Sequence, residues 1–416
     1  MTSTGRGLLV NRDFSLLWSG QLLSSVGNQM FPVILALAVL QRNAGPAGLG
    51  LVLAVQAGGF ACGTAASATF GDRYRRVAQM MAADTVRAIG VAVLAGAIFS
   101  LSFAVLLAVV ALIGVAEGSF LPAYIAVVPR LVDDEELQNA NALNALSTNI
   151  AMVAGPALGG ALAGYVGVRS ALWIDLASFG FSLATLLPIS ERHRAGPTGK
   201  VATVAKRSGR SDFLEALHAV GGRPWLSVSI LTATILMTLV VAPAYVAAPV
   251  VARARLGGAA AYGAIFAALG VGSIIGSLIG GRLRLQRVGL VAAGGLLTIA
   301  GAAASLAALP LVAVLLLWGI AGIGVTVFQV VWATAVQRDV PDRLLGRVMA
   351  LDQLGSQGLM PIGYGLAGFV LAAYGARVLL FSGAALVFVV VPLPLIARGG
   401  LYLSSRPVPD RGVPTS

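Results

Sequence analysis

Four acidic side chains and one arginine lie inside long apolar stretches of this sequence, where ionisable groups are costly and usually functional. They are Asp84, Arg87, Glu117, Asp175 and Asp352. Asp84 and Arg87 are three residues apart, so on a helix they share one face and form an ion pair. We expect this pair to have a mainly structural role.

The other carboxylates are candidates for proton coupling, because a carboxyl group removed from water and cations can exchange a proton near neutral pH. Glu117 has no basic residue within two helical turns and is the first candidate. A glutamic acid that only hydrogen-bonds a neighbouring helix would give the same pattern. Asp352 lies near the inner end of its stretch, where it would contact the segment around Asp72. Asp175 is expected near an outer end, where hydration alone would account for it.

Uncharged polar side chains recur at helical spacing within the apolar stretches. Such side chains must face protein or water, so they line a cavity or hydrogen-bond another helix. We expect a substrate cavity to be lined by Gln21, Ser25, Asn28, Asn144, Thr148, Gln329, Gln353 and Gln357. Scattered aromatic residues offer stacking surface for an organic substrate, although helix packing would explain any one of them. The scarcity of arginine within the stretches argues against a phosphate or dicarboxylate substrate.

The apolar stretches that hold these residues are long enough to cross a membrane. Hydrophobic residues make up 58% of the 416 residues and charged residues 11%, against about 25% charged in a soluble domain. About 20 apolar residues span the hydrocarbon as a helix, so we predict an all-α integral membrane protein. Its twelve transmembrane helices are approximately 14–40, 47–70, 77–98, 101–128, 139–165, 170–189, 225–250, 260–281, 288–308, 311–336, 347–373 and 376–397.

The positive charges predict the orientation. Lys and Arg mark cytoplasmic loops, and with the N-terminus inside, 22 of the 28 basic residues fall on that side and five on the other. The net charge of +12 therefore reflects topology and not nucleic-acid binding. We expect a multi-pass protein of the cell membrane with both termini in the cytoplasm.

The two halves of the chain resemble each other. Segments 131–137 and 339–345 are similar and lie 208 residues apart, and segments 155–164 and 360–368 lie 205 apart. Repeats of this kind build transporters with a substrate site between the halves. The predicted organisation is an N-terminal six-helix bundle (1–190), a cytoplasmic linker (191–222), a C-terminal six-helix bundle (223–400) and a cytoplasmic tail (401–416).

Three motifs carry a resemblance to a known family. Gly71–Arg76 lies between the second and third spans, Gly155–Gly160 lies in the fifth, and Leu345–Val348 opens the eleventh. Together they resemble the major facilitator superfamily, and more narrowly its bacterial enterobactin and macrolide exporters. The first motif departs from the family pattern at Ala68 and Arg75.

The resemblance implies roles for the motif residues. Asp72, Arg73 and Arg76 would form a conformational latch, while simple positive-inside anchoring is the alternative for the arginines. Gly155, Pro156, Gly159 and Gly160 would seal a gate, since small residues let helices approach closely and proline removes a helical hydrogen bond.

The expected function is export of a small organic molecule, such as a drug, siderophore or secondary metabolite, by proton antiport and alternating access. Import of a small metabolite is the main alternative, and a non-transporting receptor a weaker one. An enzyme is not expected, because His193 and His218 lie outside the spans and no catalytic motif stands out within them. The expected partners are the substrate, protons and lipid, with no metal or other cofactor, and the protein is expected to be monomeric.

Overall fold

The structure is a computed structural model that describes residues 11–70, 74–133, 136–189, 215, 217–282 and 287–403. Only the backbone is described for residues 68–70 and 342–343. Every regular element within these residues is helical, which confirms the predicted all-α fold. Most of the predicted linker and tail, together with Asp72 and Arg73, lies outside the described residues.

The N-terminal half consists of long helices joined by short turns. Asn11 and Ser102 cap the first and fourth of them, accepting the N–H groups of Phe14 and Val105, which satisfies donors that the first helical turn leaves free. The helices are α2 (Arg12–Gln41), α3 (Gly45–Phe70), α4 (Arg76–Ala97), α5 (Phe103–Leu131), α6 (Leu137–Tyr165) and α7 (Val168–Leu186).

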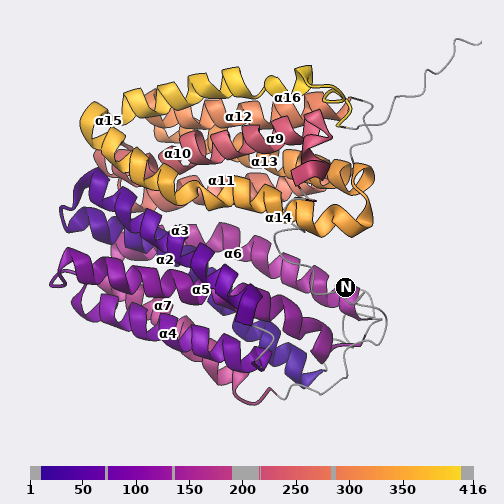
Figure 1. Cartoon of the computed structure of the whole chain (residues 1–416). Coiled ribbons are helices and arrows are strands. Elements are labelled where there is room, and N and C mark those ends of the chain that lie inside the picture. Colours follow the sequence, from indigo (N-terminus) through magenta and orange to yellow (C-terminus); the bar gives the residue numbers. More distant parts are fainter. Residues whose placement is uncertain are drawn as a thin grey trace, which may run out of the picture.

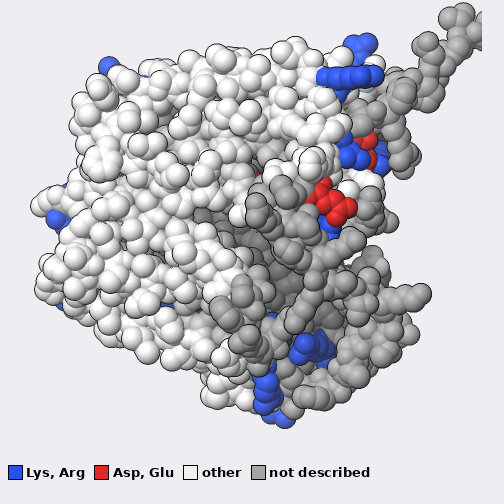
Figure 2. Space-filling model, viewed as in Figure 1, with Lys and Arg blue, Asp and Glu red and all other residues white. Residues whose placement is uncertain are grey.

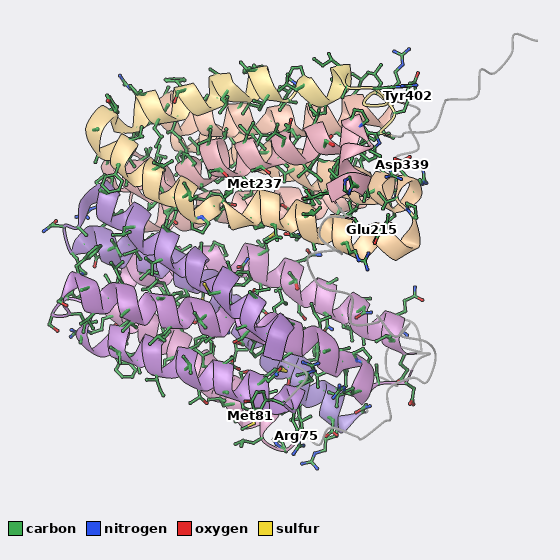
Figure 3. The ribbon with its side chains drawn as sticks, in the orientation of Figure 1. Arg75, Met81, Glu215, Met237, Asp339 and Tyr402 are labelled. Carbon is green, nitrogen blue, oxygen red and sulfur yellow. The ribbon has the colours of Figure 1, made fainter. Side chains whose placement is uncertain are left out.

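The C-terminal half opens with a helix that contains two π-helical segments, one in its middle, beginning at Met237 (Figure 3), and one at its end. Predicted as 225–250, this helix runs on to Leu256. The elements are α9 (Pro224–Leu236), η2 (Met237–Val241), α10 (Ala242–Val251), η3 (Ala252–Leu256), α11 (Ala259–Gly280), α12 (Val288–Ala308), α13 (Leu311–Asp339), α14 (Asp342–Gly358), α15 (Met360–Val390) and α16 (Leu393–Ile396).

Ten helical stretches within the described residues are long and apolar enough to cross a membrane. The difference from the predicted twelve has two sources. The stretch Leu344–Ile396 counts once, although the chain turns back at Gly375, whose φ of 79° is not helical, as Figure 1 shows. The helix α7 does not count, because Arg169, Asp175 and several serines make it less apolar. On the face seen in Figure 2, a broad uncharged belt separates charged groups that lie toward the two ends.

The helices form two bundles, α2–α7 and α9–α16, lying side by side (Figure 1). The turns at 42–44, 98–102, 166–167, 257–258 and 309–310 lie at one end, which we call the closed end because the bundles meet there. Toward the other end, which carries Arg75, Arg130 and Arg338, the bundles diverge (Figure 1). We call this the open end.

Glycines let the two bundles touch backbone to backbone near the closed end. A Cβ atom on Gly50 of α3 would lie 2.8 Å from the Cα atom of Gly368 in α15, and one on Gly160 of α6 would lie 2.7 Å from that of Gly263 in α11. Real side chains do not tolerate such distances, so these positions require glycine for this packing. Backbone contacts of the same kind thus join α3, the second helix of the N-terminal bundle, and α6, the fifth, to the C-terminal bundle.

Candidate functional site

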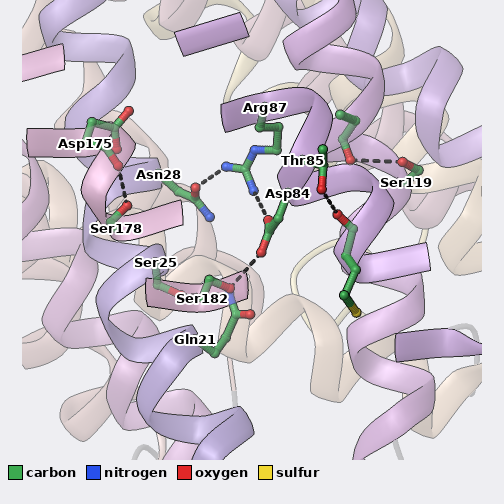
Figure 4. Close-up of polar contacts among 12 residues, drawn as sticks. Gln21, Ser25, Asn28, Asp84, Thr85, Arg87, Ser119, Asp175, Ser178 and Ser182 are labelled. Atoms are coloured by element: carbon green, nitrogen blue, oxygen red, sulfur yellow. Dashed lines mark hydrogen bonds and ion pairs between the residues drawn. The ribbon is translucent and has the colours of Figure 1, made fainter. Parts of the chain in front are cut away.

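A buried charge cluster lies inside the N-terminal bundle, centred on Arg87 of α4 (Figure 4). The Arg87 side chain is 3% exposed and that of Asp84 is fully buried, and their charged atoms lie 3.5 Å apart. Arg87 also donates to the amide oxygen of Asn28 in α2, and its guanidinium lies 4.5 Å from the ring centre of Phe179 in α7. Ser182 of α7 donates to the other Asp84 oxygen at 2.6 Å. The predicted Asp84–Arg87 pair is confirmed.

Two further carboxylates belong to this cluster. Glu117 of α5 and Asp175 of α7 both interact electrostatically with Arg87. Glu117 is half-buried, with the Gln56 side chain within hydrogen-bonding reach. Glu117 has no basic neighbour along its own helix, but in the structure Arg87 of α4 supplies a cation near it.

The expectation that Asp175 is hydrated near a helix end was wrong. It is fully buried near the midpoint of α7. Neither of its carboxylate oxygens accepts a hydrogen bond of good geometry, and Ser178 donates instead to its main-chain oxygen at 2.7 Å. A Cβ atom on Gly27 of α2 would lie 2.5 Å from Asp175 Oδ1, so close helix packing, not water, surrounds this carboxylate.

The cluster thus places one cation among three carboxylates at mid-depth of the bundle. Arg87 and Glu117 lie near the midpoints of α4 and α5, and Asn28 lies near that of α2. Within the cluster, the side chains of Asp84 and Asp175 are fully buried, while those of Glu117 and Asn28 are half-buried. An excess of buried negative charge is costly, so the arrangement is suited to binding a proton.

The C-terminal bundle has an aromatic cluster in its interior instead. Phe266 of α11 contacts three rings, with centroid distances of 5.0 Å to Tyr245, 5.3 Å to Tyr262 and 5.3 Å to Trp318. Trp318 is buried and donates to the main-chain oxygen of Ala302 at 3.1 Å. Tyr245 and Phe266 are half-buried. Spacing along the chain predicts only the contact of Tyr262 with Phe266, four residues apart in α11, because Tyr245 and Trp318 come from two other helices.

The predicted cavity residues of the N-terminal bundle lie in two groups. Gln21 is buried and donates to Ser25 at 3.4 Å, while Asn28 is engaged by Arg87. Asn144 of α6 accepts the hydroxyl group of Tyr124 at 2.6 Å. Thr148 is exposed one turn from Met152, whose main-chain oxygen meets Gly270 of α11, so Thr148 continues the face that α6 presents to the other bundle.

The predicted cavity residues of the C-terminal bundle, Gln329, Gln353 and Gln357, are all exposed. Gln357 lies near the end of α14, seven residues before Tyr364 of α15, whose main-chain oxygen contacts Gly50 of α3. Asp352 is half-buried on α14, with the Trp332 side chain within hydrogen-bonding reach.

The glycines predicted to act in gating lie at two interfaces of α6. Gly155 and Gly159 pack against α2, where a Cβ atom on Gly159 would lie 3.0 Å from the Met30 oxygen. Gly160 and the Pro156 oxygen instead meet Gly263 of the other bundle. Arg76 is the half-buried first residue of α4.

Ion pairs at the open end of the C-terminal bundle connect its helices. Arg223, just before α9, lies 3.3 Å from Asp339 at the end of α13, and Arg347 of α14 lies 2.5 Å from Glu215; Figure 3 shows Asp339 and Glu215 near that end. Among the described residues, no three His, Cys, Asp or Glu side chains gather as metal ligands would.

Comparison with known proteins gives a family for this arrangement. The model of the Major Facilitator Superfamily matches residues 17–359, whereas a search of curated protein sequences finds no significant match. Among solved structures, that of a mutant of the nucleoside transporter NupG is similar with a TM-score of 0.75 at 12% identity, covering 92% of this chain and 99% of that one.

Two bacterial structures described as inward-facing share the fold as well. A homologue of the iron transporter ferroportin has a TM-score of 0.71 at 20% identity, covering 95% of this chain and 99% of its own. A homologue of the human lysosomal transporter Spinster has a TM-score of 0.71 at 15% identity, covering 98% and 100%. The family match covers most of the chain, so this protein belongs to the major facilitator superfamily and is a multi-pass secondary transporter of small molecules, not an enzyme.

Proposed function

We propose that this transporter exports small organic molecules, such as drugs, siderophores or secondary metabolites, across the cell membrane in exchange for protons. It works as a monomer by alternating access between the two bundles. The motifs Gly155–Gly160 and Leu345–Val348, which resemble those of enterobactin and macrolide exporters, support the export direction. Gly155, Pro156, Gly159 and Gly160 act in its gate, and Asp72, Arg73 and Arg76 in its cytoplasmic latch.

The distribution of arginine supports an orientation with both termini in the cytoplasm. Arg75, Arg130 and Arg338 lie at the open end with most of the other described arginines, and positive charge marks the cytoplasmic side. The open end then faces the cytoplasm, where an exporter takes up its substrate.

The observation that carries proton coupling is the charge cluster of the N-terminal bundle. With all groups ionised, Arg87 leaves two of the three carboxylates uncompensated, and buried uncompensated charge is expensive. Glu117 is the half-buried member, so an arriving proton reaches it before the fully buried Asp84 and Asp175. Asp175 and Asp352 are the second candidates.

Protonation of Glu117 gives the cluster a way to change the packing of the bundle. A neutral Glu117 no longer attracts Arg87, whose Nε atom has no hydrogen-bond partner. Arg87 then pairs more fully with Asp84 or Asp175. Because these residues come from α4, α5 and α7, with Asn28 from α2, a charge change at one carboxylate alters how four helices fit together.

The aromatic cluster supports an organic substrate. Tyr245 and Phe266 are the half-buried rings of that cluster, and an organic ring gains stacking energy on such a surface. Polar side chains that fix the orientation of the substrate are then Gln21, Ser25, Asn28, Asn144, Thr148, Gln329, Gln353 and Gln357.

Proton-coupled efflux in proteoliposomes tests this function. A panel of dyes, macrolides and siderophores is offered to vesicles carrying wild type or Glu117→Gln, with and without a pH gradient. One proton exchanged per neutral substrate supports about tenfold accumulation per pH unit. We expect wild type to accumulate a compound in this way and Glu117→Gln to exchange it without accumulation.

The matched control is Glu136→Gln, which makes the same chemical change next to α6 at the open end and is expected to behave as wild type. Uphill transport by Glu117→Gln at the wild-type level would move the coupling role to Asp175 or Asp352. Accumulation in the opposite direction under the same gradient would identify an importer. A panel that does not move under any gradient would contradict the exporter proposal.

A further inference from the structure

Arginines at the closed end donate to main-chain oxygens where helices end. Arg42 donates to Ile98 and Leu101, just after α4. Arg255 donates to Leu306 at 2.6 Å, in the last turn of α12. The last carbonyl groups of a helix lack partners within it and carry partial negative charge, so a guanidinium stabilises them. These arginines therefore have a structural use beyond loop charge.

Arg42 and Arg255 perform the same task in the two halves of the chain. Arg42 directly follows α2, the first helix of its bundle, and binds the end of α4, the third. Arg255 lies in η3, which ends the first helix of the C-terminal bundle, and binds the end of α12, again the third. Each bond stays within one bundle and persists when the bundles move as bodies.

Arg253 has no such counterpart, because its bond crosses between the bundles. It lies in η3 two residues before Arg255, and two residues along a helix turn a side chain to nearly the opposite side. Arg253 is thereby directed away from α12 and donates to the main-chain oxygen of Leu40, at the end of α2, at 2.6 Å. Short π-helical segments of this kind are frequent at functional sites.

We propose that Arg253 is the outer latch of the transporter, a cationic side chain that holds the closed end shut by binding the end of α2. Opening of that end moves η3 away from Leu40 and breaks the bond once per transport cycle. The contacts of Gly50 with Gly368 and of Gly160 with Gly263 supply close packing at the same interface, and Arg253 adds a charge-assisted hydrogen bond with a defined direction.

The inference rests on the alternation assumed in the proposed function, but its test requires neither substrate nor protons. Spin labels at Ser100→Cys and Leu309→Cys, both exposed at the closed end of opposite bundles, report the opening of that end by double electron–electron resonance. The background variant Cys62→Ser removes the single native cysteine. A failed export assay therefore leaves this measurement interpretable.

We expect Arg253→Gln to raise the population with the closed end open by about 3- to 10-fold, as loss of one partly exposed, charge-assisted bond implies. Arg253→Lys keeps the charge and a hydrogen-bond donor and should restore most of the wild-type distance distribution. Arg255→Gln, two residues away, is the matched control and should leave the distribution unchanged. An unchanged distribution in Arg253→Gln, or an equal shift in Arg255→Gln, would overturn the latch.

Discussion

The interiors of the two bundles differ more than their frameworks. At mid-depth the N-terminal bundle holds Arg87 with Asp84, Glu117 and Asp175. The C-terminal bundle holds aromatic rings that meet Phe266 edge-on or tilted. Its sequence has no charged residue in 224–252, and in 256–337 charged residues occur only between 282 and 287. One half is built around a charge imbalance and the other around apolar, polarisable surface.

The frameworks around these interiors correspond. Gly50 with Gly368 and Gly160 with Gly263 make equivalent close contacts between the bundles, and Arg42 and Arg255 bind equivalent helix ends. The two halves thus share contacts that hold the helices together and differ in the side chains of their interiors. On the function proposed above, the N-terminal bundle carries proton coupling, and the C-terminal bundle supplies the aromatic surface for the substrate.

The largest expected effect comes from removing the cation of the N-terminal cluster. Arg87→Met leaves three buried or half-buried carboxylates without a counter-charge, and breaking a buried pair in this way costs about 3–5 kcal/mol. We expect a clear loss of thermal stability in detergent, measured by intrinsic fluorescence. The double variant Arg87→Met with Asp84→Asn should recover part of the loss. Unaltered stability of Arg87→Met would show that the cluster is not an electrostatic unit.

The shared framework is tested by a single methyl group. Gly50→Ala places a Cβ atom 2.5 Å from the Tyr364 oxygen of the other bundle, and overpacking of this kind costs about 1–3 kcal/mol. We expect the closed end to open more often, measured with the spin-label pair described above. Gly58→Ala on the same helix meets no atom within 4 Å and should have no effect. Equal responses of the two variants would argue against backbone contact at Gly50.

The aromatic cluster should affect substrate binding and leave coupling alone. Phe266→Leu removes three ring contacts, each worth about 0.5–1.5 kcal/mol beyond buried area. On the proposed function it also removes a ring on which the substrate stacks. We expect the KM for an aromatic substrate to rise while the ratio of protons to substrate stays the same. Phe369→Leu, on an exposed face of α15, is the control. A changed ratio of protons to substrate in Phe266→Leu would contradict the assignment of coupling to the N-terminal bundle alone.

The sequence predicts the helices better than the site, for a physical reason. Apolar length alone predicts a span, and the break between the last two spans coincides with Gly375. The neighbours of Asp175 and Glu117 come from other helices, so spacing along the chain cannot reveal Arg87 beside them. The predicted span ended at residue 250, which placed Arg253 and Arg255 in a loop. In the structure the helix continues to Leu256 through a π-helical segment, and nothing in the sequence indicates this extension.

Asp352 provides the smallest expected effect and the sharpest check on the comparison. It is the acidic residue on α14 of the C-terminal bundle that was predicted as a coupling candidate, and Trp332 is within reach of its carboxylate. Among the described side chains, the partner found for this carboxylate is Trp332, whereas the three carboxylates of the N-terminal cluster surround Arg87. Asp352→Asn keeps the shape of the side chain and a hydrogen-bond acceptor for Trp332. We therefore expect Asp352→Asn to accumulate substrate uphill within about twofold of wild type, against complete loss in Glu117→Gln. A neutral amide at position 352 leaves no buried counter-charge unpaired.

The measurement is the same pH-driven efflux, with both variants in parallel vesicles. Loss of accumulation in Asp352→Asn with Glu117→Gln unaffected would place coupling in the C-terminal bundle, and the charge imbalance around Arg87 would then serve structure alone.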